Sequence, residues 1–153
     1  MGRLAAIARR DKSRAPMQLL EKADISEVTG VAHDFRGKSK SRKVTLLSAR
    51  VWEDVCTELG KELPWTTRRS NLLVDDIDLP QSTGDVIEIG DVRLQVNKEV
   101  DPCFRMDEQC PGLTAALTPN WRGGVACVVL SGGMVTIGDE VNIVKSSNGD
   151  EQT

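Results

Sequence analysis

The sequence predicts a mainly β protein with short helices, folded as a closed or nearly closed β-barrel. Six or more short apolar segments are separated by glycine-containing turns, and only two stretches have helical character. The chain has neither the strand-helix alternation of a parallel sheet nor a glycine-rich phosphate-binding fingerprint. At 153 residues we expect one domain over residues 1–144, followed by a flexible polar tail at 145–153.

The N-terminal part combines one strand with a long basic loop. Residues 3–10 form the first expected strand, in which Leu4 and Ile7 are apolar. Residues 11–43 contain glycines, a proline and a basic run at 36–43, so we expect them to be mostly loop. A loop this long in a compact domain is usually functional or disordered.

Charge is distributed unevenly along the chain. Residues 1–43 contain eleven Lys or Arg and five Asp or Glu, whereas residues 44–153 contain nine and eighteen. This asymmetry indicates either an N-terminal segment that faces an anion or a solvated basic loop. Nucleic acid is not expected as a partner, because Phe35 is the only aromatic residue among these basic residues. In the same region, His33 and Asp34 either serve a site or lie at the surface.

A strand followed by a helix is predicted next. Residues 44–47 are apolar and β-branched, and Ser48 supplies an N-cap hydroxyl for a helix that runs to Leu59 and ends at Gly60. Apolar residues fall on one face of this helix at helical spacing: Val51, Trp52, Val55, Cys56 and Leu59. Cys56 is therefore assigned to the core.

A polar constellation stands before a buried strand at 72–74: Arg68, Arg69, Ser70 and Asn71. Its guanidinium, hydroxyl and amide groups match phosphate or carboxylate oxygens, which predicts an anion clamp. In an extended segment, only residues two positions apart would share a face. The spacing supports equally well an arginine pair that forms salt bridges with Asp75, Asp76 or Asp78.

The C-terminal half is predicted to be mostly β. A hairpin is expected from strands at 85–89 and 92–96 joined by Gly90-Asp91. Residues 109–117 are at best one short helix, with Pro111 in its first turn. Three further strands follow, the first of them buried on both faces, at 125–130, 134–137 and 140–144. The glycine pairs at 123–124 and 132–133 mark either close backbone approaches or tight turns.

The four cysteines indicate which metal or disulfide chemistry, and which cellular compartment, the chain is expected to have. They include no CxxC pair, so neither a zinc site nor a disulfide framework is indicated, and Cys127 falls in a core strand. The chain is expected to be reduced and cytoplasmic. No apolar run is long enough for a signal peptide or a membrane span, so no membrane partner is expected.

Cys103 is the candidate reactive residue. It follows Pro102, which holds the exit from a strand, and Arg105 places a positive charge two positions later that favours the thiolate. The acidic residues Asp101, Asp107 and Glu108 act in the opposite direction. The residue types therefore indicate a nucleophile or metal ligand, with a small apolar residue that fills a gap as the alternative.

The succession of segments resembles the MOSC domain family, found in molybdenum-cofactor sulfurases, mitochondrial amidoxime-reducing enzymes and small stand-alone bacterial proteins. The match rests on an ordered set of segments: residues 30–34, 44–48, 68–74, Pro102-Cys103, Gly112-Leu113, 122–125 and 138–141. The resemblance implies a mixed β-barrel with an exposed cysteine, and Cys103 is the matching position. That cysteine would carry sulfur as a persulfide or ligate molybdenum directly.

The resemblance further implies binding of the molybdenum cofactor. Arg68, Arg69 and Asn71 match the family's basic stretch and would line the site for the pterin phosphate. Arg105 is also expected to bind the cofactor. A sulfur donor or acceptor protein such as a cysteine desulfurase would be the partner. A thiolate suits both roles, because it attacks sulfane sulfur and is a soft metal ligand.

The sequence departs from the family in two places. Ala32-His33-Asp34 stands where many relatives have a glycine before the aspartate, and no pyridoxal phosphate lysine is identifiable in this chain. Whether the chain is an enzyme is left open by the sequence. Two alternatives to a sulfur carrier or cofactor-binding domain are a molybdenum-dependent reductase of N-hydroxylated substrates, which would need an electron donor, and a non-catalytic barrel that binds an anionic partner.

Overall fold

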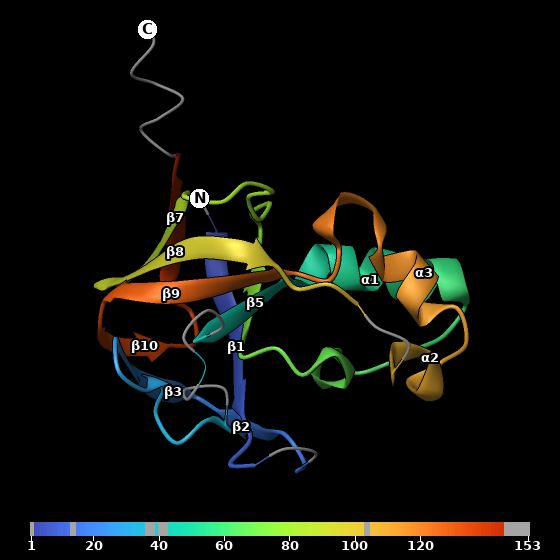
Figure 1. The fold of residues 1–153 in the computed structure, drawn as a ribbon, viewed down its shortest axis with the longest axis horizontal. Helices are drawn as coiled ribbons and strands as arrows, with labels where there is room; N and C mark the ends of the chain where they lie inside the picture. The colour runs from blue at the N-terminus through green and yellow to red at the C-terminus, as the bar shows by residue number, and fades with distance from the viewer. Residues whose placement is uncertain (1, 13–14, 36–38, 40–42, 103–104, 146–153) are drawn as a thin grey trace, which may run out of the picture.

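The structure is a computed structural model that describes residues 2–12, 15–35, 39, 43–102 and 105–145. Within these residues, seven strands close into a mixed β-barrel in the order β11-β7-β8-β9-β5-β6-β1, and β11 pairs with β1 to complete the circle (Figure 1). Only β5 and β6 run parallel among these pairs. The barrel strands are β1 (Gly2–Arg9), β5 (Val44–Ser48), β6 (Leu72–Asp75), β7 (Val86–Ile89), β8 (Val92–Glu99), β9 (Val125–Ser131) and β11 (Glu140–Val144). The predicted closed barrel is confirmed.

Alternating side chains fill the barrel. In β8, Val92, Leu94 and Val96 are buried, whereas the residues between them are exposed or partly buried. This period of two is that of a strand with one face on the core. β5 is buried along its whole length, as expected of a strand covered on both faces. Cys127 is fully buried in β9, as predicted, and burial raises the pKa of its thiol.

The segment 11–43 contains more strand than the sequence predicts. β2 (Gln18–Leu20) pairs with β1, and β3 (Lys22–Ser26) lies between β4 (Gly30–Val31) and β10 (Gly133–Thr136) in a small second sheet. Three short strands therefore lie in this segment, while most of its described residues remain outside strands, as predicted. β3 alternates buried Ala23 and Ile25 with more exposed residues, and its partner β10 comes from more than a hundred residues later. A local pattern of five residues does not reveal that pairing.

Helices cover one side of the barrel (Figure 1). They are α1 (Ala49–Leu59), the 3-10 turn η2 (Trp65–Arg68), α2 (Arg105–Gln109), α3 (Leu113–Leu117) and the 3-10 turn η3 (Pro119–Trp121). α1 begins and ends as predicted, because the Ser48 side chain accepts from Val51 N–H and Gly60 adopts a left-handed conformation with φ 66°. Trp52 and Val55 pack with α2 and α3 in a second apolar cluster.

The single helix predicted over 109–117 is two helices. α2 ends at Gln109 and α3 begins at Leu113, with Gly112 at φ 89° before it. Pro111 lies in the turn between the two helices instead of in the first turn of one. A left-handed glycine interrupts helical geometry, which explains the break.

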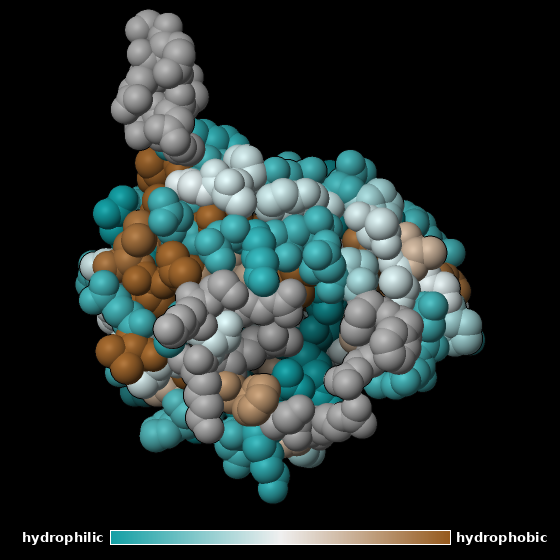
Figure 2. Space-filling model, viewed as in Figure 1, coloured by the Kyte–Doolittle hydropathy of each residue, from teal (hydrophilic) through white to brown (hydrophobic). Residues whose placement is uncertain are grey.

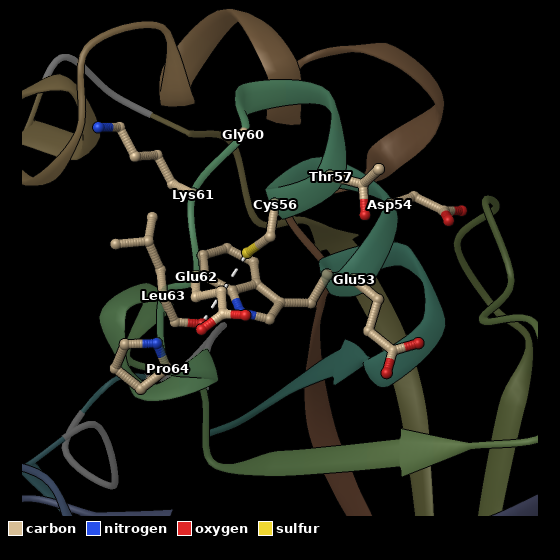
Figure 3. Close-up of a pocket in the computed structure, with 10 residues that line it drawn as sticks. Glu53, Asp54, Cys56, Thr57, Gly60, Lys61, Glu62, Leu63 and Pro64 are labelled. Atoms are coloured by element: carbon tan, nitrogen blue, oxygen red, sulfur yellow. Dashed lines mark hydrogen bonds between the residues drawn. The ribbon is translucent and has the colours of Figure 1, made fainter.

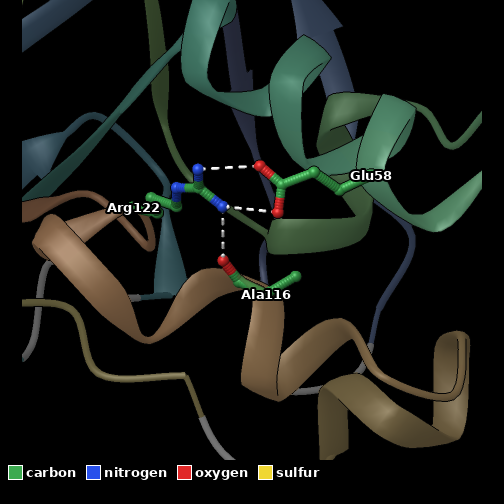
Figure 4. A network of polar contacts seen from close by, with 3 residues as sticks. All are labelled: Glu58, Ala116 and Arg122. Carbon is green, nitrogen blue, oxygen red and sulfur yellow. Dashed lines mark hydrogen bonds and ion pairs between the residues drawn. The ribbon is translucent and has the colours of Figure 1, made fainter.

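An ion pair joins α1 to the turn that precedes β9. Both guanidinium nitrogens of Arg122 donate to the Glu58 carboxylate, at 2.9 and 2.8 Å, and one also donates to the Ala116 carbonyl at 3.1 Å (Figure 4). The contact links α1, α3 and the residues after η3. It fixes the helical layer to the start of β9.

Candidate functional site

The arginine-bearing segment is a tight turn. η2 follows Pro64, with Thr67 N–H bonded to the Pro64 carbonyl at 3.0 Å, and Arg69 at φ 61° closes the turn. The expectation of an extended segment with alternating faces is therefore wrong. A 3-10 turn followed by a left-handed residue sends Arg68 and Arg69 in different directions.

Arg68 is buried and bound to main-chain oxygens. Its Nη2 donates to the Val100 carbonyl at 2.7 Å and its Nε donates to the Gly123 carbonyl at 3.1 Å. Its Nη1 lies 4.0 Å from the Sδ of Met106. Only 6% of Arg68 is exposed. The guanidinium thus joins the end of β8, the start of α2 and the residues before β9.

Gly123 permits this approach. A Cβ at this position would lie 2.5 Å from the Val100 oxygen and 2.8 Å from Nη2 of Arg68. Gly132 is similar, because its Cβ would lie 2.5 Å from the Ile25 oxygen. A Cβ at Gly124 would meet the Leu46 oxygen, so both members of the first glycine pair and one member of the second are close backbone approaches. This is one of the two explanations that the sequence left open.

Asn71 is also buried and bonded to the barrel. Its Oδ1 accepts from the N–H of Thr45 at 3.1 Å, and its Nδ2 donates to the Ala8 carbonyl at 3.2 Å. Only 1% of Asn71 is exposed. These bonds tie the residue before β6 to β5 and β1, so Asn71 has a structural role that its position in a polar run did not reveal.

Arg69 lines a small polar pocket. Its Nη1 donates to the Ala15 carbonyl at 2.5 Å, which holds the side chain toward residues 15–17. The pocket has a volume of about 200 Å³, and its lining consists of Met17, Thr66, Thr67, Arg69 and Gln109. Figure 2 shows a hydrophilic depression on the face that carries η2. The last residue of α2 thus meets the arginine turn.

Cys103, and the side chain of Arg105 at the start of α2, lie outside the part of the chain that the structure describes. The described residues on either side are well packed, since Val100 is 4% exposed and Met106 is 9% exposed. Arg68 contacts both of them. The buried guanidinium therefore contacts described residues three positions before and three positions after Cys103.

Glu99 is a candidate site residue that the sequence reasoning missed. Its pKa is raised by burial, by the negative charge of Asp101 and by a side-chain hydrogen bond with Asp101, while Arg68 lowers it. The available signal was the presence of two carboxylates, Glu99 and Asp101, two positions apart where strand β8 ends.

The other candidates from the sequence are placed as follows. His33 is exposed at φ 65°, whereas Asp34 is 8% exposed and its carboxylate accepts from Arg10 N–H at 2.9 Å. Asp76, a predicted partner of the arginine pair, pairs with Arg3 at 3.5 Å. Cys56 is partly buried as part of the helical cluster.

Within the described ranges, no three His, Cys, Asp or Glu side chains are arranged to hold a metal ion. In that same part of the chain, no helix has the length and apolar character needed to cross a membrane.

The fold is that of a small β-barrel domain. Helices cover one side of its closed mixed barrel, and the buried Arg68 lies beside them. The family model of the MOSC domain matches residues 32–142, which is most of the chain. The chain therefore belongs to the MOSC domain family, as its sequence resemblance indicates. No curated protein has significant sequence similarity to it.

Three solved structures of bacterial proteins have folds similar to that of this chain. YuaD from Bacillus subtilis has a TM-score of 0.78 at 18% sequence identity, over 94% of this chain and 96% of that one. YiiM from Escherichia coli has a TM-score of 0.70 at 14% identity, over 94% of this chain and 70% of that one. YiiM from Geobacillus stearothermophilus has a TM-score of 0.67 at 14% identity, over 94% and 73%. At these identities the likeness concerns the fold alone.

Proposed function

We propose that this chain is a MOSC domain that carries sulfur as a persulfide on Cys103 and binds the phosphate end of the molybdenum cofactor beside Arg69. The observation that carries the proposal is the position of Arg68. It contacts Val100 and Met106, on either side of Cys103, and the next residue lines the polar pocket. A sulfur-bearing side chain and an anion site would therefore lie on adjoining segments.

The pocket residues suit a phosphate group. One guanidinium, two hydroxyls and one amide supply hydrogen bonds to phosphate oxygens. A volume of about 200 Å³ is below the roughly 300–1,000 Å³ of common small-molecule sites, so the pocket fits the phosphate and not the whole cofactor. When bound, the cofactor supplies a soft metal centre, for which a cysteine thiolate is a suitable ligand.

Arg68 and Asn71 have a different part in this proposal. Their polar groups bond to main-chain atoms, so they support the site by holding the barrel strands and the segment that carries Cys103. Arg69, Thr66 and Thr67 are then the residues that contact the anion. This separates the predicted clamp into one binding arginine and two supporting residues.

The sulfur step is a thiol-disulfide type exchange. The Cys103 thiolate attacks the terminal sulfur of a persulfide on a donor such as a cysteine desulfurase, and a new sulfur-sulfur bond forms on Cys103. The bond between that sulfur and the donor cysteine breaks. The donor cysteine leaves as a thiolate and takes a proton from water, so no external oxidant is required.

A labelling experiment tests the sulfur step. Wild type, Cys103→Ser and Cys56→Ser are incubated with a cysteine desulfurase and sulfur-labelled cysteine, and protein-bound label is measured before and after reduction. We expect reducible label on wild type and Cys56→Ser and its loss from Cys103→Ser. Equal label on Cys103→Ser would refute the assignment.

Cofactor binding is tested separately. Protein produced in a host that makes the molybdenum cofactor is assayed for bound molybdenum and pterin, with Arg69→Met as the pocket variant and Arg50→Met as the control on exposed α1 surface. We expect the cofactor content to fall only in Arg69→Met.

Bound cofactor together with reduction of an N-hydroxylated substrate by an artificial electron donor would favour the reductase alternative. Salt-sensitive binding of an anionic partner that is indifferent to Cys103→Ser would favour the non-catalytic one.

A further inference from the structure

A second hollow lies on the helical side of the molecule. It has a volume of about 870 Å³ and is formed between α1 and the segment 60–64 (Figure 3). Its lining consists of Trp52, Glu53, Asp54, Cys56, Thr57, Gly60, Lys61, Glu62, Leu63 and Pro64. None of these residues lines the pocket beside Arg69. We call this hollow the α1 groove.

The walls of the α1 groove are fixed by hydrogen bonds. The left-handed Gly60 reverses the chain after α1, and Lys61 N–H bonds back to the Cys56 carbonyl at 3.0 Å. The Leu63 carbonyl then accepts from the indole N–H of Trp52 at 2.9 Å, and the Cys56 Sγ lies 3.9 Å from the same oxygen. Because both walls are held together, the groove exists without a ligand and a partner need not order it on binding.

The α1 groove combines an apolar surface with carboxylates. Leu63 and Pro64 provide accessible apolar surface, while the charged lining residues are Lys61 and three acids, Glu53, Asp54 and Glu62. In Figure 3 the Lys61 ammonium lies apart from the carboxylates of Glu53 and Glu62. Among the residues that the structure describes, no ion pair engages Glu53 or Glu62. Two carboxylates therefore face the opening, and no cation of the described residues is paired with either.

We propose that the α1 groove is the docking site for a basic segment of a partner protein, one that carries an aliphatic side chain between Lys or Arg residues. The aliphatic side chain would cover Leu63 and Pro64, and the cations would meet Glu53 and Glu62. Charge complementarity selects this occupant, because anionic surfaces such as acidic lipids are repelled by the carboxylates. This proposal does not depend on the role of Cys103.

A second copy of this chain fits the groove less well. The chain's own basic stretch at 36–43 has the sequence Arg-Gly-Lys-Ser-Lys-Ser-Arg-Lys, which offers positive charge without an apolar side chain. It would satisfy the carboxylates and leave Leu63 and Pro64 exposed. The octapeptide with this sequence is therefore a matched probe for charge without an apolar anchor.

Fluorescence anisotropy with two labelled octapeptides tests the proposal. One probe is Arg-Gly-Lys-Leu-Lys-Leu-Arg-Lys, and the other is the 36–43 sequence, which has the same charge and serine in place of both leucines. The groove variant Glu53→Lys/Glu62→Lys is compared with Glu27→Lys/Glu140→Lys, which has the same net charge and changes exposed residues elsewhere. We expect the leucine-containing peptide to bind wild type more tightly than the 36–43 peptide, and the groove variant to weaken that binding by about tenfold or more.

Three binding results, and one sedimentation result, would overturn the proposal. The first is no binding of the leucine-containing peptide to wild type at low salt, and the second is an equal loss in both charge variants. The third is equal affinity for the two peptides, which would mean that the carboxylates attract positive charge in general. If sedimentation shows a wild-type dimer that the groove variant alone dissociates, the occupant is a second copy and the partner assignment is wrong.

Discussion

Arg68 and Gly123 are 55 residues apart in the sequence, and the Nε of Arg68 donates to the Gly123 carbonyl at 3.1 Å. The same guanidinium donates to the Val100 carbonyl at 2.7 Å. Both carbonyls belong to residues that are buried, so their hydrogen-bonding capacity must be met within the protein. The Arg68 side chain, which comes from a short turn, therefore supplies hydrogen bonds to two buried main-chain carbonyls, one after β8 and one before β9.

Replacing Arg68 with Met is expected to destabilise the fold. Met has similar length and cannot donate, so the buried oxygens of Val100 and Gly123 lose their partner. Each unsatisfied group costs about 1–3 kcal/mol, so the two groups together predict a loss of about 2–6 kcal/mol in the free energy of unfolding. Chemical denaturation measures this, with the exposed Arg50→Met as the control. If both variants lost the same small free energy of unfolding, the hydrogen bonds of Arg68 to Val100 and Gly123 would not contribute to stability as argued.

Gly123→Ala is expected to destabilise more than Gly60→Ala. At Gly123 the added Cβ would meet the Val100 oxygen at 2.5 Å, and main-chain atoms in a barrel cannot move away without displacing β8. Gly60 has open space around its Cβ and a φ of 66°, so alanine there costs only the left-handed conformation, about 1–2 kcal/mol. Thermal unfolding of the two variants distinguishes them, and a Gly60 variant that was the less stable would contradict the steric argument.

Local signals in the sequence were enough for α1 and for the hairpin. Ser48 and Gly60 mark the ends of α1 through short-range bonds, and the alternation in β7 and β8 determines which side chains enter the core. The order of segments also identified the family before any contact was known. These features depend on residues that are close in the chain, where pattern and structure are directly related.

Contacts between distant residues could not be predicted. Nothing near Arg68 in the sequence indicates that its partners are Val100 and Gly123, or that Asn71 reaches Ala8, 63 residues earlier. The polar residues 68–71 were predicted to form a binding surface because their spacing in the sequence cannot distinguish exposed hydrogen-bond donors from buried ones. The proposed site is therefore smaller than the predicted clamp, with Arg69 as its binding arginine.

Glu99 predicts a pH dependence of stability. Burial and the neighbouring Asp101 raise the pKa of Glu99 above its ordinary value of 4.5, so the folded state holds a proton that the unfolded state releases. This contribution is fully present below pH 4.5 and is lost as pH rises through the raised pKa. Glu99→Gln should therefore be more stable relative to wild type at pH 7 than at pH 4. Urea denaturation across this range measures the difference, and a constant difference would contradict the assignment.

Asp101→Asn provides the control for that dependence. It removes the negative charge that helps to raise the pKa of Glu99, while burial still acts on the carboxyl group. The pH-dependent part of the stability should become smaller in Asp101→Asn without disappearing. If it were unchanged, burial alone would account for the raised pKa of Glu99.

Glu58 predicts the opposite dependence. Hydrogen bonds from Arg122 lower the pKa of Glu58, and the charge of Arg122 adds to this while burial opposes it (Figure 4). A lowered pKa means that the pair stabilises the fold above pH 4.5, the ordinary value, and that this contribution is lost as pH falls through the lowered pKa. Glu58→Gln should thus cost stability at pH 7 and converge with wild type in acid.

Arg122→Met should cost more than Glu58→Gln at neutral pH. Arg122 also donates to the Ala116 carbonyl at 3.1 Å, a bond that does not depend on the carboxylate and that joins α3 to the turn before β9. The ion pair is partly exposed, so added salt should reduce the cost of Glu58→Gln, whereas the Ala116 bond is less sensitive to salt. A double-mutant cycle in low and high salt separates the two contributions. Equal costs for the two single variants, with equal salt dependence, would show that the bond to Ala116 contributes nothing and that the carboxylate alone holds Arg122 against the helical layer.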